Sequence, residues 1–158
     1  MRLLIFAALF LLALPAAAQS LVGRSLNEYG GVAGYVNCAG GNCFNNANPD
    51  FDIEAWEGLG TRTLVVLTKT GKPRIVDAIV LPKQVSADLE LSMGGCRMDG
   101  VLNSRLVGAG LALAKYDDLQ KLSYVWRLTT QGKLVVVLAP GIKNKSRIAC
   151  LNPISYVE

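Results

Sequence analysis

Residues 63–81 have the sequence TLVVLTKTGKPRIVDAIVL. Two apolar runs, residues 63–68 and 74–81, flank the polar residues 69–72, Lys-Thr-Gly-Lys. Aliphatic and β-branched runs favour strands, and a short polar link that contains glycine is typical of a β-hairpin. Antiparallel strands can be joined by so short a link, whereas a parallel crossover needs about a dozen residues or more. This stretch therefore predicts an antiparallel hairpin in the middle of the chain.

Further apolar runs toward the C-terminus indicate more strands of the same kind. In residues 85–93, apolar and polar side chains alternate, which is the period-two pattern of a strand with one solvated face. Gly94-Gly95 and Asp99-Gly100 mark turns, and residues 116–122 fit one helical turn or a polar loop. The other expected strands are residues 105–113, 123–129, 133–138 and 147–151. The pattern predicts a mainly β protein, a β-rich α+β fold arranged as a single antiparallel sheet or a small sandwich.

Residues 19–62 differ in amino-acid composition from residues 63–158. They are rich in glycine and asparagine, as in the Asn-Asn-Ala-Asn-Pro run at 45–49, and such runs are typical of loops. We therefore expect a loop-rich, disulfide-stapled N-terminal segment over residues 19–62 and a β-rich domain over residues 63–158. Together the two parts have the length of one ordinary domain, so we expect a single folding unit.

The first eighteen residues have the pattern of a secretory signal peptide. Arg2 provides a positive charge, residues 3–14 are an apolar run, and Ala16-Ala17-Ala18 forms an A-x-A cleavage site. The apolar run is shorter than the ~20 residues that span a bilayer. We therefore expect cleavage after Ala18, a mature chain without a transmembrane span, and a periplasmic or secreted location.

Four cysteines, Cys38, Cys43, Cys96 and Cys150, follow this leader. An even number of cysteines in an exported chain predicts disulfides, and four cysteines allow three connectivities. The Ala-Gly-Gly-Asn link between Cys38 and Cys43 is flexible enough to close on itself, which favours the pairs Cys38–Cys43 and Cys96–Cys150. A zinc site is disfavoured because Cys96 and Cys150 stand alone in the sequence and no histidine exists to complete a mixed site.

The basic excess of the chain is small, with a formal net charge of +4. Its densest group is Lys143, Lys145 and Arg147. Surfaces for nucleic acid or anionic lipid are usually denser and include stacking aromatic residues. We interpret this group mainly as a solvated loop, with a patch for nucleic acid or anionic lipid as the alternative, and we expect no nucleic-acid partner.

Three short motifs in the C-terminal half carry a resemblance to a known class of protein. They are Cys96-Arg97-Met98-Asp99-Gly100, Val125-Trp126-Arg127 and Ile148-Ala149-Cys150-Leu151-Asn152. Their order resembles a pattern in small uncharacterised exported proteins of Gram-negative bacteria, namely Cys-x-x-Asp-Gly, Trp-Arg and Cys-x-Asn. The resemblance covers about the last 60 residues and implies an envelope protein with a Cys96–Cys150 bridge. It implies no activity and no functional residues.

The chain contains no histidine. Ser-His-Asp and Cys-His catalysis and histidine-ligated metal sites are therefore excluded. The G-x-S-x-G, P-loop and dinucleotide-binding motifs are also missing from the sequence. Any catalysis would depend on carboxylates, tyrosine, lysine or a bound ion, and we expect no catalytic residues.

The acidic residues concentrate in DFDIEAWE, residues 50–57. We expect Asp50 or Asp52 to cap a short helix that carries Glu54 and Glu57 in its first turn, with Trp56 packed on the sheet. A hydrolase that acts on cell-wall sugar through a carboxylate pair, with Trp56 binding the sugar, is an alternative.

A calcium-stabilised structural module over residues 46–57 is another alternative. Oxygen-bearing side chains recur at the intervals of a calcium-binding loop, with Glu57 at the last position, although Phe51 replaces the usual glycine. The candidate ligands are Asn46, Asn48, Asp50, Asp52 and Glu57. Our main expectation remains an exported, non-catalytic binding or inhibitor-like protein of the cell envelope that needs no cofactor and whose partner is another envelope or exported protein.

Overall fold

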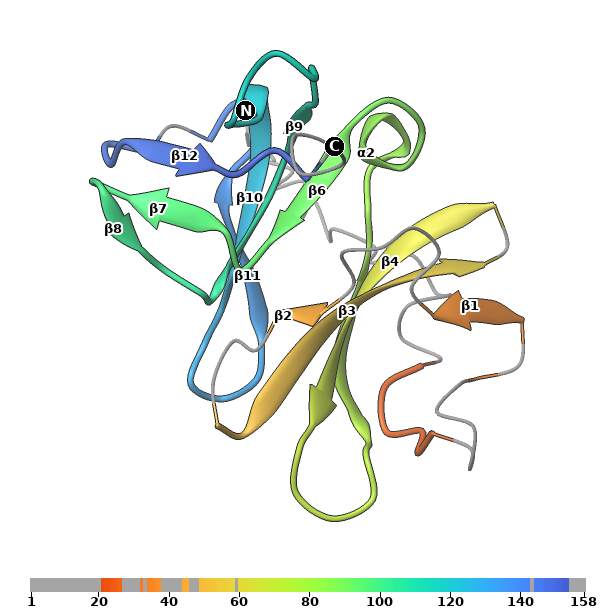
Figure 1. The fold of residues 1–158 in the computed structure, drawn as a ribbon. Helices are drawn as coiled ribbons and strands as arrows, with labels where there is room; N and C mark the ends of the chain where they lie inside the picture. The colour runs from red at the N-terminus through yellow and green to blue at the C-terminus, as the bar shows by residue number, and fades with distance from the viewer. Residues whose placement is uncertain are drawn as a thin grey trace, which may run out of the picture.

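The computed structural model describes residues 21–26, 32, 34–37, 44–45, 49–58, 60–142 and 144–153 (Figure 1). The fold is mainly β, as predicted, and its strands pair in antiparallel fashion in three sheets. One short helix, α2 (Lys83–Ala87), is present in these ranges. In Figure 1 the first sheet lies at the lower right, and the other two lie at the upper left.

The first sheet has five strands in the order β1-β3-β4-β5, with β2 also paired to β3. The second has four strands in the order β11-β10-β9-β6, and the third has the order β12-β7-β8. The strands are β1 (Tyr35–Asn37), β2 (Phe44–Asn45), β3 (Phe51–Gly58), β4 (Thr61–Thr68), β5 (Ile75–Val80), β6 (Glu90–Met93), β7 (Cys96–Met98), β8 (Val101–Leu102), β9 (Leu106–Leu111), β10 (Gln120–Leu128), β11 (Leu134–Leu138) and β12 (Ile148–Cys150).

The predicted hairpin is confirmed by β4 and β5, which pair in antiparallel register. Gly71 lies in the turn between them with a φ of +71°, a conformation that glycine adopts without strain. The strands expected over residues 105–113, 123–129, 133–138 and 147–151 correspond to β9, β10, β11 and β12. Residues 116–119 form a loop in which Asp118 bridges to Leu151, and residues 120–122 are the start of β10.

The apolar run of β4 is buried on both faces, and this places it at the centre of the fold. Leu64 and Val66 face the second sheet, where they pack in one cluster with Trp126 and Leu128 of β10. On the opposite face, Val65 and its neighbours pack with N-terminal residues of the chain. Of the two predicted arrangements, the core between the first and second sheets matches a small sandwich.

The strand predicted over residues 85–93 is wrong in its first half. Residues 83–87 form α2, and only Glu90–Met93 form a strand, β6. The helical turn begins after Pro82, whose carbonyl accepts hydrogen bonds from the backbone N–H groups of Val85 and Ser86 at 2.9 and 3.1 Å. Pro82 is the N-cap residue, with a φ of −52° and a ψ of 148°, so the helical residues begin at Lys83.

The helix expected near residues 50–57 is also wrong, because these residues lie in β3. Eight residue pairs join β3 to β4, from Phe51 opposite Thr68 to Gly58 opposite Thr61. The backbone hydrogen bonds of the segment are therefore made across strands. The hairpin also crosses the expected boundary between residues 62 and 63, so the two parts share one sheet.

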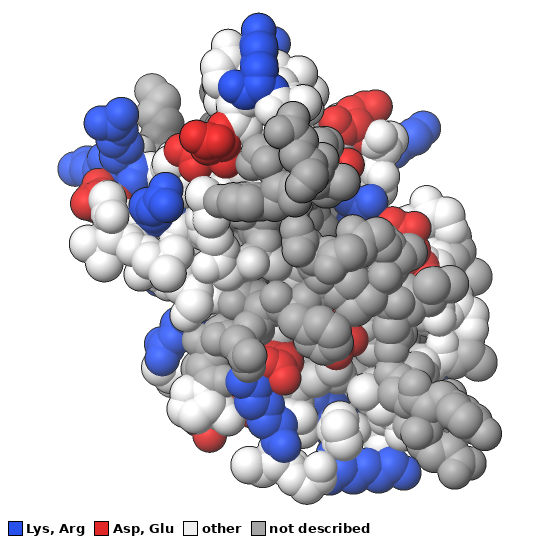
Figure 2. All heavy atoms as spheres, viewed as in Figure 1, with Lys and Arg blue, Asp and Glu red and all other residues white. Residues whose placement is uncertain are grey.

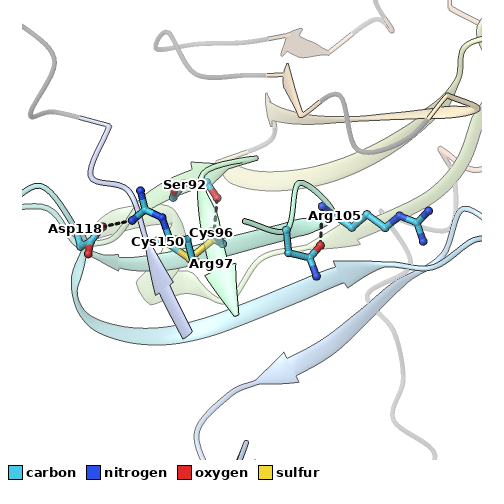
Figure 3. Close-up of a disulfide and its surroundings, with 7 residues drawn as sticks. Ser92, Cys96, Arg97, Arg105, Asp118 and Cys150 are labelled. Carbon is cyan, nitrogen blue, oxygen red and sulfur yellow. Dashed lines mark hydrogen bonds and ion pairs between the residues drawn. A yellow bond between two sulfur atoms is a disulfide. The ribbon is translucent and has the colours of Figure 1, made fainter. Parts of the chain in front are cut away.

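Cys96 and Cys150 form a disulfide that joins β7 to β12 (Figure 3). Both cysteines are fully buried in a cluster with Leu106, Leu119 and Val125. Gly108 of β9 lies against this bridge, and a Cβ atom at Gly108 would collide with the sulfur of Cys150. Cys38 and Cys43 lie outside the described residues, so their pairing stays a prediction.

Asn152 and Asp99, two residues of the C-terminal motifs, form hydrogen bonds to the backbone. Asn152 is fully buried, and its Nδ2 atom donates to the carbonyls of Leu113 and Tyr116 at 2.9 Å each. Asp99 accepts a hydrogen bond from the backbone N–H of Arg147 at 2.8 Å. These hydrogen bonds hold the loop at residues 113–116 and the turn of the β7–β8 hairpin in place near the disulfide.

Within the described ranges, no helix has the length and apolar character needed to cross a bilayer. The predicted leader, residues 1–18, lies outside these ranges and stays a prediction.

Candidate functional site

A concavity of about 420 Å³ lies beside the turn that joins β3 to β4. Its volume falls within the range of small-molecule sites, about 300–1,000 Å³. The residues that line it come from β3, β4, α2 and the segment before β1. They are Gly34, Glu57, Gly58, Gly60, Thr61, Arg62 and Ser86. We call this concavity the hairpin pocket.

The charged groups of the hairpin pocket are Glu57 and Arg62, which lie directly opposite each other on β3 and β4. Arg62 Nη2 and Nε donate to Glu57 Oε1 at 3.0 and 3.3 Å. The Glu57 side chain is 42% exposed and that of Arg62 is 19% exposed. The carboxylate is therefore oriented by the arginine but remains open to solvent.

Two further contacts hold Arg62 in place. Its backbone N–H donates to Ser86 Oγ of α2 at 3.2 Å, and its Nη1 atom donates to the Leu89 carbonyl at 3.5 Å. Because α2 supplies one wall, the turn of helix that sequence periodicity missed is part of the site. Charge-assisted hydrogen bonds of this kind fix the direction of a side chain as well as its charge.

Glycines leave the space that the pocket occupies. Gly58 faces Tyr35 across the β1–β3 pair, and a Cβ atom at Gly58 would lie 2.7 Å from Tyr35 Cδ1. Gly60 in the turn has a φ of +71°, which disfavours other residues. The close packing of Tyr35 and the tight turn both require glycine at these positions.

Glu54 and Trp56 lie on the other face of β3 from Glu57, because side chains alternate along a strand. Trp56 is fully buried, and its Nε1–H donates to Glu54 Oε2 at 2.6 Å. Trp56 belongs to the sheet itself and not to a helix packed on it, and its full burial leaves no exposed ring on which a sugar could stack. Glu54 is itself buried, with 7% of its surface exposed.

Burial raises the pKa of Glu54 above its ordinary value, because desolvation disfavours the charged carboxylate. The hydrogen bond from Trp56 lowers the pKa, and the nearby charge of Asp52 raises it, but desolvation is the largest influence. The folded chain therefore holds the Glu54 proton to higher pH than the unfolded chain does.

Replacing Glu54 with glutamine is expected to flatten the pH dependence of stability. The raised pKa means that the Glu54 contribution is fully present below pH 4.5, the ordinary pKa, and is lost as pH rises through the folded-state pKa. Glutamine does not titrate, and its carbonyl can still accept the Trp56 hydrogen bond. Urea unfolding measured from below pH 4.5 upward should show that the free energy of unfolding of E54Q exceeds that of the wild type by an amount that grows with pH.

The exposed Glu90 provides a matched control for the removal of one carboxylate, and the change of slope in E54Q is measured against E90Q. Parallel profiles for E54Q and the wild type would show that burial of the Glu54 carboxylate does not affect its titration.

The structure does not bring together the described members of the calcium set. Asp52 forms an ion pair with Lys69 at 3.0 Å and lies on the opposite face of β3 from Glu57. Asn46 and Asn48 lie outside the described residues. In the part of the chain that is described, no group of three or more acidic or cysteine side chains could hold a metal ion.

Arg62 and Ser86 were not identified from the sequence as site residues. They are 24 positions apart and meet only because α2 packs beside β4. Glu57 was named for a different reason, as the last ligand of a calcium loop. No local motif joins these three residues, so only the β3–β4 register and the position of α2 could identify the pocket.

Comparisons of the chain with protein-family models, with curated protein sequences and with solved structures find no match.

Proposed function

We propose that this protein is an exported, non-catalytic binding protein of the bacterial cell envelope, and that the hairpin pocket is its ligand site. The observation that carries the proposal is the Glu57–Arg62 pair, which holds an open carboxylate and a guanidinium side by side in a concavity of about 420 Å³. Such a set of oriented donors and acceptors can fix a polar ligand by hydrogen bonds.

Export is supported by the buried Cys96–Cys150 bridge and by the predicted leader. Structural disulfides persist in oxidising compartments such as the periplasm and are rare in the cytosol.

The groups in the pocket favour binding over hydrolysis. A glycosidase needs two carboxyl groups on either side of one bond. Glu57 is the one carboxylate among the described residues that line the pocket, and Glu54 and Asp52 lie on the other face of β3. Glu57 is also engaged by Arg62, which occupies one of its oxygens.

A cell-wall component is the ligand that the pocket fits best. The volume is that of a small molecule, and the lining combines a carboxylate, a guanidinium and the hydroxyls of Thr61 and Ser86. Disaccharide-peptide fragments of peptidoglycan carry the matching hydroxyl, amide, amine and carboxylate groups. A protein partner could enter the pocket only with a single protruding side chain.

Calorimetric titration with soluble disaccharide-peptide fragments tests this proposal. Wild type should bind, and E57Q should bind about tenfold more weakly, because a hydrogen bond to a charged group contributes roughly 1.5 kcal/mol or more. The control is D88N, a change at an exposed carboxylate at the end of α2 that does not line the pocket. The absence of binding by wild type, or equal weakening in D88N, would refute the proposal.

A further inference from the structure

A second concavity lies on the outer face of the third sheet, away from the hairpin pocket residues. It has a volume of about 430 Å³ and is lined by Arg97, Asp99, Gly100, Arg147 and Ala149. Arg97 lies opposite Ala149 in the β7–β12 register, whereas the neighbouring pair Cys96 and Cys150 faces the core. Because side chains alternate along a strand, the two arginines share the solvent face of this sheet.

The guanidinium groups at this face are largely unused by the protein. Arg97 Nη1 lies 3.8 Å from Asp118 Oδ1, an ion pair too long for a hydrogen bond, and both side chains are at least 40% exposed (Figure 3). Asp99 directs one carboxylate oxygen to the backbone N–H of Arg147 at 2.8 Å. Among the described residues, the Arg147 guanidinium has no ion-pair partner.

The local charge is positive. Lys145 is exposed two residues before Arg147, so three basic side chains accompany the two carboxylates of Asp99 and Asp118. Basic side chains gather on the surface around β7, β8 and β12 at the left of Figure 2. Arginine is suited to such a face because its planar fork can bind two oxygens of one phosphate or carboxylate group.

Two exposed aliphatic side chains lie on β8, next to the strand that carries Arg97. Val101 and Leu102 of β8 are 71% and 61% exposed, the highest values among the large hydrophobic residues described as exposed. Leu102 lies directly opposite Arg97 and shares its face, whereas Val101 lies opposite Met98 on the other face of the hairpin. The β7–β8 hairpin turns at Asp99 and Gly100, both at positive φ, and it lies at one margin of the molecule (Figure 1).

We propose that this face binds the headgroup of an anionic phospholipid, with Leu102 entering the membrane interface and Arg97 and Arg147 holding the phosphate. Shallow apolar insertion next to cationic side chains is the combination that attaches proteins to anionic membrane surfaces. The site does not depend on the hairpin pocket, so the two proposals can fail separately.

The size of the face favours a lipid over a protein partner. A stable protein interface buries about 800 Å² on each side, whereas the projecting apolar surface on the arginine side of the hairpin comes from Leu102. The edge strand β8 has two residues, which leaves little backbone for a partner strand to pair with. The concavity, by contrast, has a volume of about 430 Å³, which leaves room for a phospholipid headgroup, and the small residues Gly100 and Ala149 are part of its lining.

Flotation of the protein with phospholipid vesicles tests the proposal. We expect binding to vesicles that contain phosphatidylglycerol and little binding to vesicles of phosphatidylcholine alone. The double variant R97Q/R147Q should bind the anionic vesicles about 30-fold more weakly, since each basic residue near such a surface contributes about 1 kcal/mol. L102D should also lose binding, because it places a carboxylate at the interface.

The matched control is K72Q/K83Q, which removes the same charge at two exposed lysines outside the third sheet. An equal loss in this control would show that binding follows total charge and would overturn the proposal. Equal binding to neutral vesicles would do the same, as would affinity for glycerol phosphate or for poly-glutamate that matches affinity for the vesicles. Unchanged melting temperatures will confirm that the exposed substitutions leave the fold intact.

Discussion

Replacing Cys96 and Cys150 together with alanine is expected to lower the free energy of unfolding by about 4 kcal/mol in the chain-entropy model. The bridge closes a loop with a sequence separation of 54 residues, so its loss frees a large part of the unfolded chain. Both sulfurs are also buried against Gly108, and alanine leaves space there. Urea unfolding of the oxidised wild type and of C96A/C150A measures the difference.

The matched control is C38A/C43A. If the predicted Cys38–Cys43 bridge exists, its short loop contributes roughly 2 kcal/mol in the same model, which is clearly less. Intact mass with and without reductant tells whether each pair is oxidised. A loss below about 1 kcal/mol in C96A/C150A would contradict a main stabilising role for the Cys96–Cys150 bridge.

Replacing Trp56 with alanine is expected to lower the free energy of unfolding by about 3–5 kcal/mol, because truncation of a large buried aromatic leaves a cavity. The indole is fully buried among residues of the first sheet and the N-terminal segment, with the Tyr35 ring centroid at 6.1 Å. The variant also leaves the Glu54 carboxylate buried without its Nε1–H donor, which adds to the loss. Chemical denaturation followed by circular dichroism measures the effect.

A double-mutant cycle separates the two causes. W56F keeps most of the ring volume but removes the donor, so its cost should shrink when Glu54 is already glutamine, whose neutral side chain is less costly to leave unpaired. Additive effects in the W56F and E54Q cycle would contradict a coupling between these side chains. A loss below about 1 kcal/mol for W56A would contradict the core position of the indole.

The strand content was predictable where the local pattern had one interpretation. The run at residues 63–81 combines β-branched residues with a glycine turn, and β4 and β5 formed as expected. In contrast, Val85 is compatible with both a strand and one helical turn, because one apolar residue by itself cannot show whether the apolar pattern repeats every two residues or every 3.6 residues. The structure places Val85 in a helical turn that begins after Pro82, where the backbone N–H of Val85 donates to the Pro82 carbonyl.

The acidic stretch at residues 50–57 carries two sequence patterns that predict different structures. Asp50, Phe51, Asp52, Ile53 and Glu54 alternate strictly between polar and apolar, which is a strand pattern. Asp50 and Asp52 are also residue types that cap helices, and this favoured a helix over the same residues. The structure follows the alternation, because β3 can bury Ile53 between the sheets while pairing along its whole length with β4.

The amino-acid sequence was sufficient to predict the antiparallel β fold, the central hairpin and the absence of histidine-based chemistry, and it favoured the Cys96–Cys150 pairing, which the structure then selected from three possible connectivities. These depend on short-range patterns, on residue types and on counts. The hairpin pocket, the buried Glu54–Trp56 pair and the arginine face were decided only by tertiary structure. The pocket and the face that carries Arg97 and Arg147 join side chains through strand register or helix packing, which has no signature in local sequence. Glu54 and Trp56, in contrast, are close in sequence but are buried together only because the first sheet packs against the N-terminal residues.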